Sequence, residues 1–301
     1  MKNWRMTFWT PGNAPPDDGH TFGCASHGIA APGVWRGPDE AAAAGWPEKG
    51  LRGVAFSGSY AGVLAQLRND VTRPTAAIVL FAHSSGMEAF LDRWAELLPG
   101  VPVAGGGAAR GPGQVQGQLM RPAEDVTVLL IADGVWRAES LNVHDPAGTA
   151  VEFRAQGPRT ITQVRENPAA DWQSASSYFR ARQTACDREA GDCESITFAD
   201  AGGRNVHASF DGERLCTGAD LPVDKRLVLR TVSRAAAARR LEEFCAVPNA
   251  LVFGCAGLRS LLRAPLAVGE GTLAGFLFGE LVTLGGRPQF GNLMASRLVA
   301  E

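Results

Sequence analysis

Short apolar runs bounded by glycine and proline alternate with amphipathic stretches along most of the chain. The clearest example begins with an apolar run at 75–82, continues with an apolar stripe at helical spacing from Met87 to Leu98, and ends with a second run at 101–104. Apolar runs of this length are typical of buried parallel strands, and the periodic stripe predicts a helix. This segment is therefore predicted to be a strand–helix–strand unit with a right-handed crossover.

The remaining elements follow from the same reading. Ser59 and Ser233 are placed to cap helices, Ser85 with Glu88 predicts a capping box, and Asn167 followed by Pro168 predicts a further helix start. Asp211-Gly212 predicts a hairpin turn. Further strands are predicted at 54–57, 126–132, 149–153, 196–198, 206–210 and 227–232, and in several apolar runs after 249.

Together these elements predict an α/β fold of two packed halves, each a mixed β-sheet flanked by helices. The halves are expected at 53–145 and 146–301. Residues 1–52 differ from both, because they are rich in Trp, Pro and Gly and show little periodicity. Disordered segments are poor in aromatic residues, so this segment is predicted to be an ordered but irregular arm.

Composition narrows the class of protein. The 301 residues are 45% hydrophobic and 20% charged with a net charge of −2, which is typical of a globular protein and gives no reason to expect nucleic acid or a membrane as partner. The basic segment 225–240 is interpreted as a solvated strand face and helix end. No apolar run suits a signal peptide or a membrane helix, and six scattered cysteines favour a reducing compartment, so we expect a cytoplasmic protein.

Four polar residues each follow an apolar run in the last third of the chain: Cys255, Arg259, Glu280 and Asn292. We expect them to converge as one wall of a small-ligand pocket. Arg259 is the expected ion-pair partner of Glu280, and such a pair would either bind an amino-acid-like ligand or be structural. Cys255 is either a reactive thiol, activated by Arg259 and a helix start, or a small buried side chain.

A glycine run at Gly105, Gly106 and Gly107 follows the second predicted strand and precedes Arg110. It matches neither a dinucleotide fingerprint nor a P-loop. Two interpretations stay open, because glycine permits the backbone to approach either a ligand or another strand. His83 ends the first strand of the same unit and is interpreted as a structural or ligand-contacting residue, since neither neighbouring serine lies on a nucleophile elbow.

A metal site is a weaker hypothesis. His20, Cys24 and His27 offer three soft ligands at short spacing, which zinc or copper could use. The alternative is two loop histidines and a buried thiol.

The segments 251–259, 274–280 and 290–292, together with 76–81 and 99–107, resemble the FIST family of sensory domains. The resemblance implies a module that binds amino acids or similar metabolites, and some relatives bind haem. The sequence departs from the family where Leu258 precedes Arg259 and where Gly291 replaces a histidine. No signalling output segment is recognised, so a separate signalling protein is the expected partner.

Three functions are therefore considered. The first is a small-ligand-binding module that holds an amino-acid-like or other small polar metabolite in a cleft between the halves. The second is an enzyme that uses Cys255 as nucleophile or a metal at the His20, Cys24 and His27 positions. The third is a haem-binding gas sensor with His83 or His27 as axial ligand.

Overall fold

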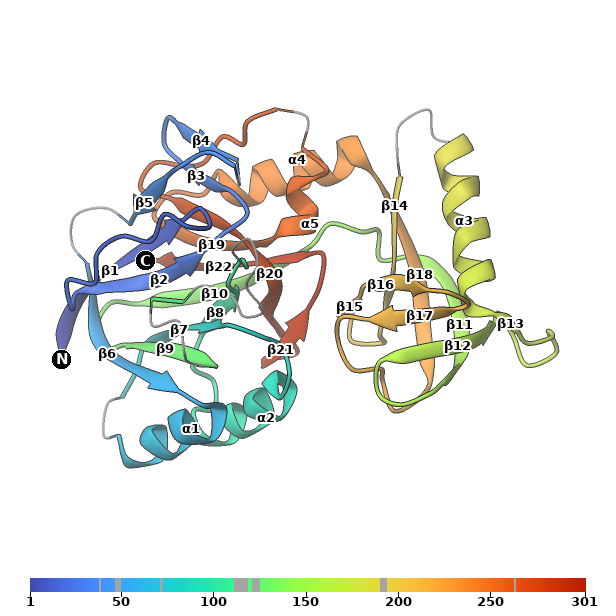
Figure 1. Ribbon diagram of the computed structural model, residues 1–301, viewed down its shortest axis with the longest axis horizontal. Coiled ribbons are helices and arrows are strands. Elements are labelled where there is room, and N and C mark those ends of the chain that lie inside the picture. Colours follow the sequence, from blue (N-terminus) through green and yellow to red (C-terminus); the bar gives the residue numbers. More distant parts are fainter. Residues whose placement is uncertain are drawn as a thin grey trace. The chain divides into compact units, whose positions relative to one another are not determined.

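The structure is a computed structural model that describes residues 1–37, 39–46, 50–70, 73–110, 119–120, 125–189, 194–262 and 264–301. It has the predicted α/β fold and divides into two compact units (Figure 1). Unit 1 comprises Met1–Leu141, Glu242–Phe290 and Met294–Glu301, and unit 2 comprises Asn142–Leu241 and Gly291–Leu293. The expected second half, 146–301, is thus shared between the two units. None of the described helices is long and apolar enough to cross a membrane.

The larger sheet is mixed, and its main path among the described residues runs β10-β22-β19-β20-β8-β7-β9-β6-β1-β2. The strands on this path are β1 (Lys2–Trp9), β2 (Thr21–Ala25), β6 (Leu51–Gly58), β7 (Ala76–Phe81), β8 (Val103–Gly107), β9 (Val126–Ile131), β10 (Trp136–Asn142), β19 (Ala250–Cys255), β20 (Leu273–Leu284) and β22 (Met294–Ala300). Four short strands join it from the side: β3 (Ile29–Ala31), β4 (Val34–Arg36), β5 (Ala43–Gly45) and β21 (Arg287–Gly291).

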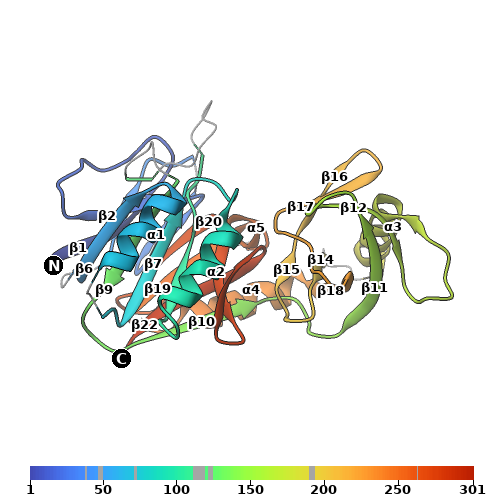
Figure 2. The ribbon, with the colours of Figure 1, turned by 90° about the horizontal axis from the view of Figure 1, so that it is seen from below.

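The predicted strand–helix–strand unit is confirmed. β7 and β8 are parallel, and α2 (Met87–Leu97) connects them with Met87, Phe90, Leu91 and Trp94 buried. α1 (Tyr60–Asn69) lies beside α2 on one face of the sheet (Figure 2). Ser59 caps α1 by accepting the Gly62 N–H at 3.1 Å, as predicted.

The predicted capping box of Ser85 and Glu88 is wrong. Gly86 precedes α2 in the left-handed conformation, with φ of 85°, and no side chain caps the helix start. The chain enters α2 through a tight turn in which the Met87 N–H donates to the Ser84 carbonyl at 3.2 Å. Glycine suits this turn because it has no Cβ to clash in the left-handed region.

The prediction that residues 1–52 are irregular is also wrong. β1 is an eight-residue strand that pairs antiparallel with β6 and parallel with β2. Its last four residues are buried on both faces, with Met6, Phe8 and Trp9 fully buried. Burial on both faces removes the alternation of polar and apolar residues by which half-buried strands are recognised.

One contact brings the two ends of the chain together inside unit 1. The Phe8 ring packs edge-on against Phe253 of β19, with ring centroids 5.7 Å apart. A Cβ on Gly275 of β20 would lie 2.6 Å from the same ring. Because β1 and β20 are well separated along the sheet, the sheet must curl for this contact to form, and the apolar side chains of both ends share one core.

Unit 2 contains an antiparallel sheet, not the mixed sheet predicted, in the order β15-β14-β18-β11-β12-β17-β16 with β13 beside β12. Its strands are β11 (Gly148–Ala155), β12 (Thr160–Arg165), β13 (Gln173–Ser174), β14 (Glu194–Ala199), β15 (Asn205–Val206), β16 (Ala208–Asp211), β17 (Arg214–Thr217) and β18 (Arg226–Ser233). The predicted hairpin turn at Asp211-Gly212 is confirmed between β16 and β17.

Of the helix starts predicted at Ser233 and Asn167, the first is confirmed and the second is wrong. Ser233 caps α4 (Arg234–Cys245) by accepting the Ala236 N–H at 3.2 Å, as predicted. The helix predicted from Asn167 instead begins later, as α3 (Ala175–Glu189). The Asn167 side chain accepts the Ala169 N–H at 3.0 Å, so it closes a local turn and does not cap a helix.

We expect Phe8→Ala to destabilise unit 1 by about 3–5 kcal/mol, because it removes a fully buried ring from the shared core. Urea unfolding followed by tryptophan fluorescence measures this change. Phe210→Ala in unit 2 is the matched control, since that ring is 39% exposed and its loss should cost much less. A loss for Phe8→Ala no larger than that of the control would contradict the assignment of β1 to the core.

Candidate functional site

Two of the predicted site residues lie together in unit 1. Cys255 ends β19 opposite Leu277, and Glu280 of β20 pairs with Gly106 across a β-bulge at Gly279. Glu280 has 0% exposure, and neither carboxylate oxygen makes a hydrogen bond of good geometry to a described residue. Burial raises the pKa of Glu280 well above its usual value, while the neighbouring Cys255 thiol and the Met294 backbone lower it in part. A neutral carboxyl group therefore lies beside this thiol.

Arg259 does not take part in this pair. It ends the single-turn helix α5 (Ala256–Arg259), and its guanidinium carbon lies 5.5 Å from the centre of the Trp35 ring. Gly28 and Gly37 pack so closely on it that a Cβ at Gly28 would lie 2.8 Å from its Cδ. No ion pair between Arg259 and Glu280 is found among the described residues, so the expected partnership of these two side chains is wrong.

The glycine run is explained by strand packing. Gly105, Gly106 and Gly107 form most of β8, which lies between β7 and β20. A Cβ at these positions would lie 1.8 Å from the Val79 carbonyl oxygen, 2.8 Å from that of Gly279 and 2.1 Å from that of Phe278. Of the two interpretations left open, close approach to neighbouring strands accounts for all three glycines. Arg110, beyond the strand, is exposed.

His83 follows β7 and is held by a carboxylate. Its Nε2 lies 3.0 Å from Oδ1 of Asp125, and both side chains are partly exposed. The Tyr60 hydroxyl donates a hydrogen bond to the His83 carbonyl. The pKa of Tyr60 is raised, mainly by burial and to a smaller extent by the charge of Asp125. This arrangement fits the structural interpretation of His83, in which Asp125 fixes the orientation of the ring.

The three residues of the metal hypothesis do not gather. Cys24 lies in the extended strand β2 and is fully buried, and burial raises the pKa of its thiol. A strand rises about 3.3 Å per residue, which separates His20 from Cys24 by about 13 Å. His20 is exposed, and its Nδ1 lies 3.3 Å from the Asn3 carbonyl oxygen. Within the ranges that the structure describes, no three His, Cys, Asp or Glu side chains form a metal-binding group.

Asn292 belongs to unit 2, whereas Cys255, Arg259 and Glu280 belong to unit 1. Its side chain packs against Gly218, where an added Cβ would lie 2.6 Å from the amide oxygen. That oxygen is buried and has no hydrogen-bond partner among the described residues. The next residue, Leu293, accepts a hydrogen bond from Asn205 at 3.2 Å, which fastens this turn to β15.

Unit 2 also contains a buried polar network that the sequence did not predict. His144 Nε2 lies 3.3 Å from the Ser195 hydroxyl, and its Nδ1 lies 3.3 Å from Nδ2 of Asn205. The same Asn205 nitrogen faces the acceptors Asn142 Oδ1 and Leu293 O, so it must be the amide donor. An amide nitrogen cannot accept a hydrogen bond, so His144 Nδ1 is the acceptor and shares the two amide hydrogens with the other two acceptors. The neutral ring then carries its proton on Nε2, which donates to Ser195. A nucleophilic triad needs the opposite tautomer, so this network is structural.

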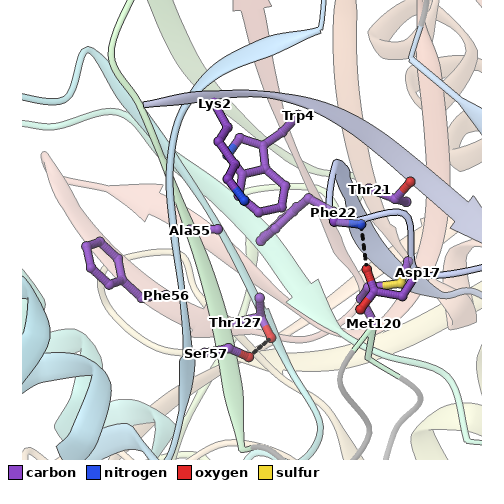
Figure 3. Close-up of a pocket in the computed structure, with 11 residues that line it drawn as sticks. Lys2, Trp4, Asp17, Thr21, Phe22, Ala55, Phe56, Ser57, Met120 and Thr127 are labelled. Carbon is purple, nitrogen blue, oxygen red and sulfur yellow. Dashed lines mark hydrogen bonds between the residues drawn. The ribbon is translucent and has the colours of Figure 1, made fainter.

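A cavity of about 90 Å³ opens in unit 1 between the N-terminal strands and β6 and β9. Figure 3 shows Lys2 and Trp4 on one side, Asp17 with Met120 on another, and Ser57 with Thr127 on a third, while the Phe56 ring points away. Its lining residues are Lys2, Trp4, Asp17, Gly19, Thr21, Phe22, Ala55, Phe56, Ser57, Met120 and Thr127.

The walls of this cavity combine opposite charges with apolar rings. The Lys2 ammonium lies 5.9 Å from the centre of the Trp4 ring. Asp17 is exposed and accepts the Gly19 N–H at 2.9 Å, and the hydroxyls of Ser57 and Thr127 are 3.0 Å apart. None of the residues predicted from the sequence lines this cavity. Lys2 and Trp4 are two residues apart, as on one face of a strand, and this spacing could have indicated the cavity. They lie in the segment 1–52, which was interpreted as irregular.

A larger cavity of about 590 Å³ lies elsewhere in unit 1, between the end of α2, β10 and the β20–β21 hairpin. Its charged side chains already have partners. Arg137 pairs with Glu139 and lies 3.6 Å from Glu301, while Arg287 lies 3.9 Å from Asp92. A ligand there would have to compete with these ion pairs, so the cavity in Figure 3 is the better candidate site.

Comparison with protein-family models and with curated proteins finds no match for this chain. The resemblance to the FIST family therefore stays a prediction.

Glu280 should make the stability of unit 1 fall as pH rises. Below about pH 4.5 the carboxyl is protonated in both the folded and unfolded states. Above it the unfolded state releases the proton that the folded state retains, so the free energy of unfolding falls by up to about 1.4 kcal/mol per pH unit until the raised folded pKa is passed. Glu280→Gln should remove this slope, as measured by urea unfolding from pH 5 to 8. Glu96→Gln, at an exposed helix position, is the control, and equal slopes in all three proteins would refute the assignment.

His144 should remain neutral well into the acid range. Burial, and then the charge of Arg230, lowers the pKa of His144 to about 4. Stability contributed by neutral His144 is present above pH 6.5 and is lost as pH falls towards 4. ¹⁵N NMR of the imidazole should show an unprotonated Nδ1 at pH 7, and Ser195→Ala should leave the low pKa largely unchanged because burial is its main cause. Titration of His144 near pH 6.5, or protonated Nδ1, would show that the network is assigned incorrectly.

Proposed function

We propose that this chain is a ligand-binding module, similar to the FIST sensory domains, whose ligand is a small zwitterion of the amino-acid class. The observation that supports the proposal is the cavity in Figure 3, in which a lysine ammonium and an aspartate carboxylate line one small space. An amino acid carries the complementary pair of charges on two groups attached to the same carbon atom. We further propose that a separate signalling protein reads the bound state.

The lining gives each part of such a ligand a partner. The ligand carboxylate would pair with Lys2, and its ammonium group would pair with Asp17. The hydroxyls of Ser57 and Thr127 supply further donors and acceptors for either group. Trp4 and buried Phe22 supply apolar surface for a short side chain. Each group alone is common on protein surfaces, but together they match one class of molecule.

The size and exposure of the cavity set limits on the ligand. Sites for drug-sized ligands have volumes of roughly 300–1,000 Å³, whereas this cavity has about 90 Å³. Glycine, alanine and serine fit this size class better than aromatic amino acids do. Because Lys2 and Asp17 are both exposed, solvent screens their charges, and binding should weaken as salt is added.

Glycine, alanine or serine should raise the thermal midpoint of the protein by a few degrees at saturation, because a ligand stabilises the state that it binds. Lys2→Gln and Asp17→Asn should each weaken binding by about tenfold, the effect of losing about 1.4 kcal/mol from one charged contact. Glycinamide and N-acetylglycine, which each lack one charge of the zwitterion, should bind correspondingly more weakly. Any affinity tag is placed after Glu301, so that added residues stay away from Lys2.

Lys225→Gln and Asp92→Asn are matched controls, since both replace exposed charges that do not line the cavity. They should leave binding unchanged. If no small amino acid binds to the unaltered protein at about 10 mM, a concentration that detects contacts worth only about 3 kcal/mol, the proposal is wrong.

A further inference from the structure

A second group of polar atoms in unit 1 has no hydrogen-bond partner in the part of the chain that the structure describes. The Nε of Arg259 and the Nε2 of His27 are both buried, and neither makes a hydrogen bond to a described residue. The two side chains are close enough for the charge of Arg259 to act on His27. Burial lowers the pKa of His27 most, Arg259 lowers it further, and Asp39 opposes them. A buried donor without an acceptor typically costs about 1–3 kcal/mol. Both residues are only partly buried as a whole, so the remaining part of each side chain is accessible to a ligand.

The fold holds both side chains in place. The backbone N–H of His27 donates to the Phe276 carbonyl at 2.6 Å, which fixes the residue against β20. Arg259 is enclosed by Gly28, Gly37 and the face of Trp35. The Arg259 side chain cannot turn away to find another partner without disturbing these contacts.

An exposed aromatic ring borders the same group. Phe278 of β20 packs edge-on against the His27 ring, with centroids 4.4 Å apart, yet 48% of Phe278 is exposed. It is one of few large apolar side chains so exposed among the described residues. Trp35 continues the aromatic surface and packs against Phe276 at 5.9 Å.

We propose that Arg259 and His27 form a second binding site, which takes a carboxylate attached to a flat apolar group. The planar guanidinium matches the geometry of a carboxylate, and the Phe278 ring offers a surface on which a flat group stacks. Asp39 and Glu40 limit the negative charge that the site accepts. Asp39 acts on His27, and Glu40 accepts the Gly37 N–H at 2.5 Å, so a monoanion is favoured over a phosphate or a dicarboxylate.

This site is independent of the zwitterion cavity, because the two share no residue. Benzoate is a suitable probe, and benzamide is its neutral counterpart of nearly the same shape. Benzoate should bind saturably, as followed by NMR signals of His27 and Phe278, and benzamide should bind at least tenfold more weakly. Bound benzoate should also raise the pKa of His27, since a nearby anion stabilises the imidazolium form.

Two variants separate the parts of the site. Arg259→Lys keeps the charge but loses the planar fork, and should weaken benzoate binding by about tenfold. Phe278→Ala should weaken benzoate by severalfold but leave acetate binding unchanged, and its exposure makes misfolding a poor explanation for the loss. Arg287→Lys and Phe210→Ala are the matched controls at exposed positions.

The proposal is overturned if benzoate and benzamide bind equally, if the His27 pKa does not rise with benzoate, or if the site variants behave like their controls. Lys2→Gln should have no effect on benzoate binding. A loss of benzoate binding in that variant would show that the probe occupies the cavity in Figure 3 instead.

Discussion

The packing of Phe8 on Gly275 is the contact on which the architecture of unit 1 depends. A side chain at position 275 would occupy the space that the ring fills, so the close approach requires glycine. Through this contact the first strand of the chain reaches one of the last, and the sheet curls around a shared apolar core. Burial of such a core supplies most of the favourable free energy of folding.

Both candidate sites follow from this curl. β1 and β2 bring Lys2, Trp4 and Phe22 towards Ser57 and Thr127, which lie on β6 and β9. The short strand β3 pairs with β20 at Ala30 and Ala274, so the segment just before it, with His27, packs on Phe276 and Phe278. A segment with the composition of a loop therefore supplies charged and aromatic groups to both sites, while the later strands supply the rigid framework.

The sequence predicted best those elements whose signal is local. A dozen residues or fewer are enough to recognise the helical stripe of α2 and the apolar runs of β7, β9 and β19. β1 was missed because its inner half is buried on both faces. The membership of β20 in the same sheet as β8 depends on pairing between distant segments, which no local pattern encodes. The hydrophobic pattern therefore identified which segments form strands, but not which strands pair with one another.

The predicted site residues also fall into two groups: those whose place follows from a local pattern and those whose place depends on distant segments. Cys255 and Glu280 were expected together and lie together, because the parallel pairing of β19 with β20 places Cys255 opposite Leu277, shortly before Glu280. Arg259 was expected beside them, but it ends a one-turn helix, and the direction of its side chain depends on where Gly28 and Gly37 lie. The glycines of β8 illustrate a further limit, since a glycine run looks alike whether the backbone approaches a ligand or a strand.

The place of β8 also has a consequence for how the protein is made. β20, which covers the open edge of β8, follows it only after the whole Asn142–Leu241 segment, so during synthesis that edge stays unpaired until β20 has been made. Exposed edges are templates for pairing with other chains, and a topology rich in distant contacts folds slowly. Glycine has a low β-propensity, so Gly105 to Gly107 disfavour pairing of β8 with a strand of another chain. They also leave few side chains that another chain could contact. The glycines that permit close packing in the finished sheet should therefore also lower the tendency of this edge to pair with other chains before β20 is made.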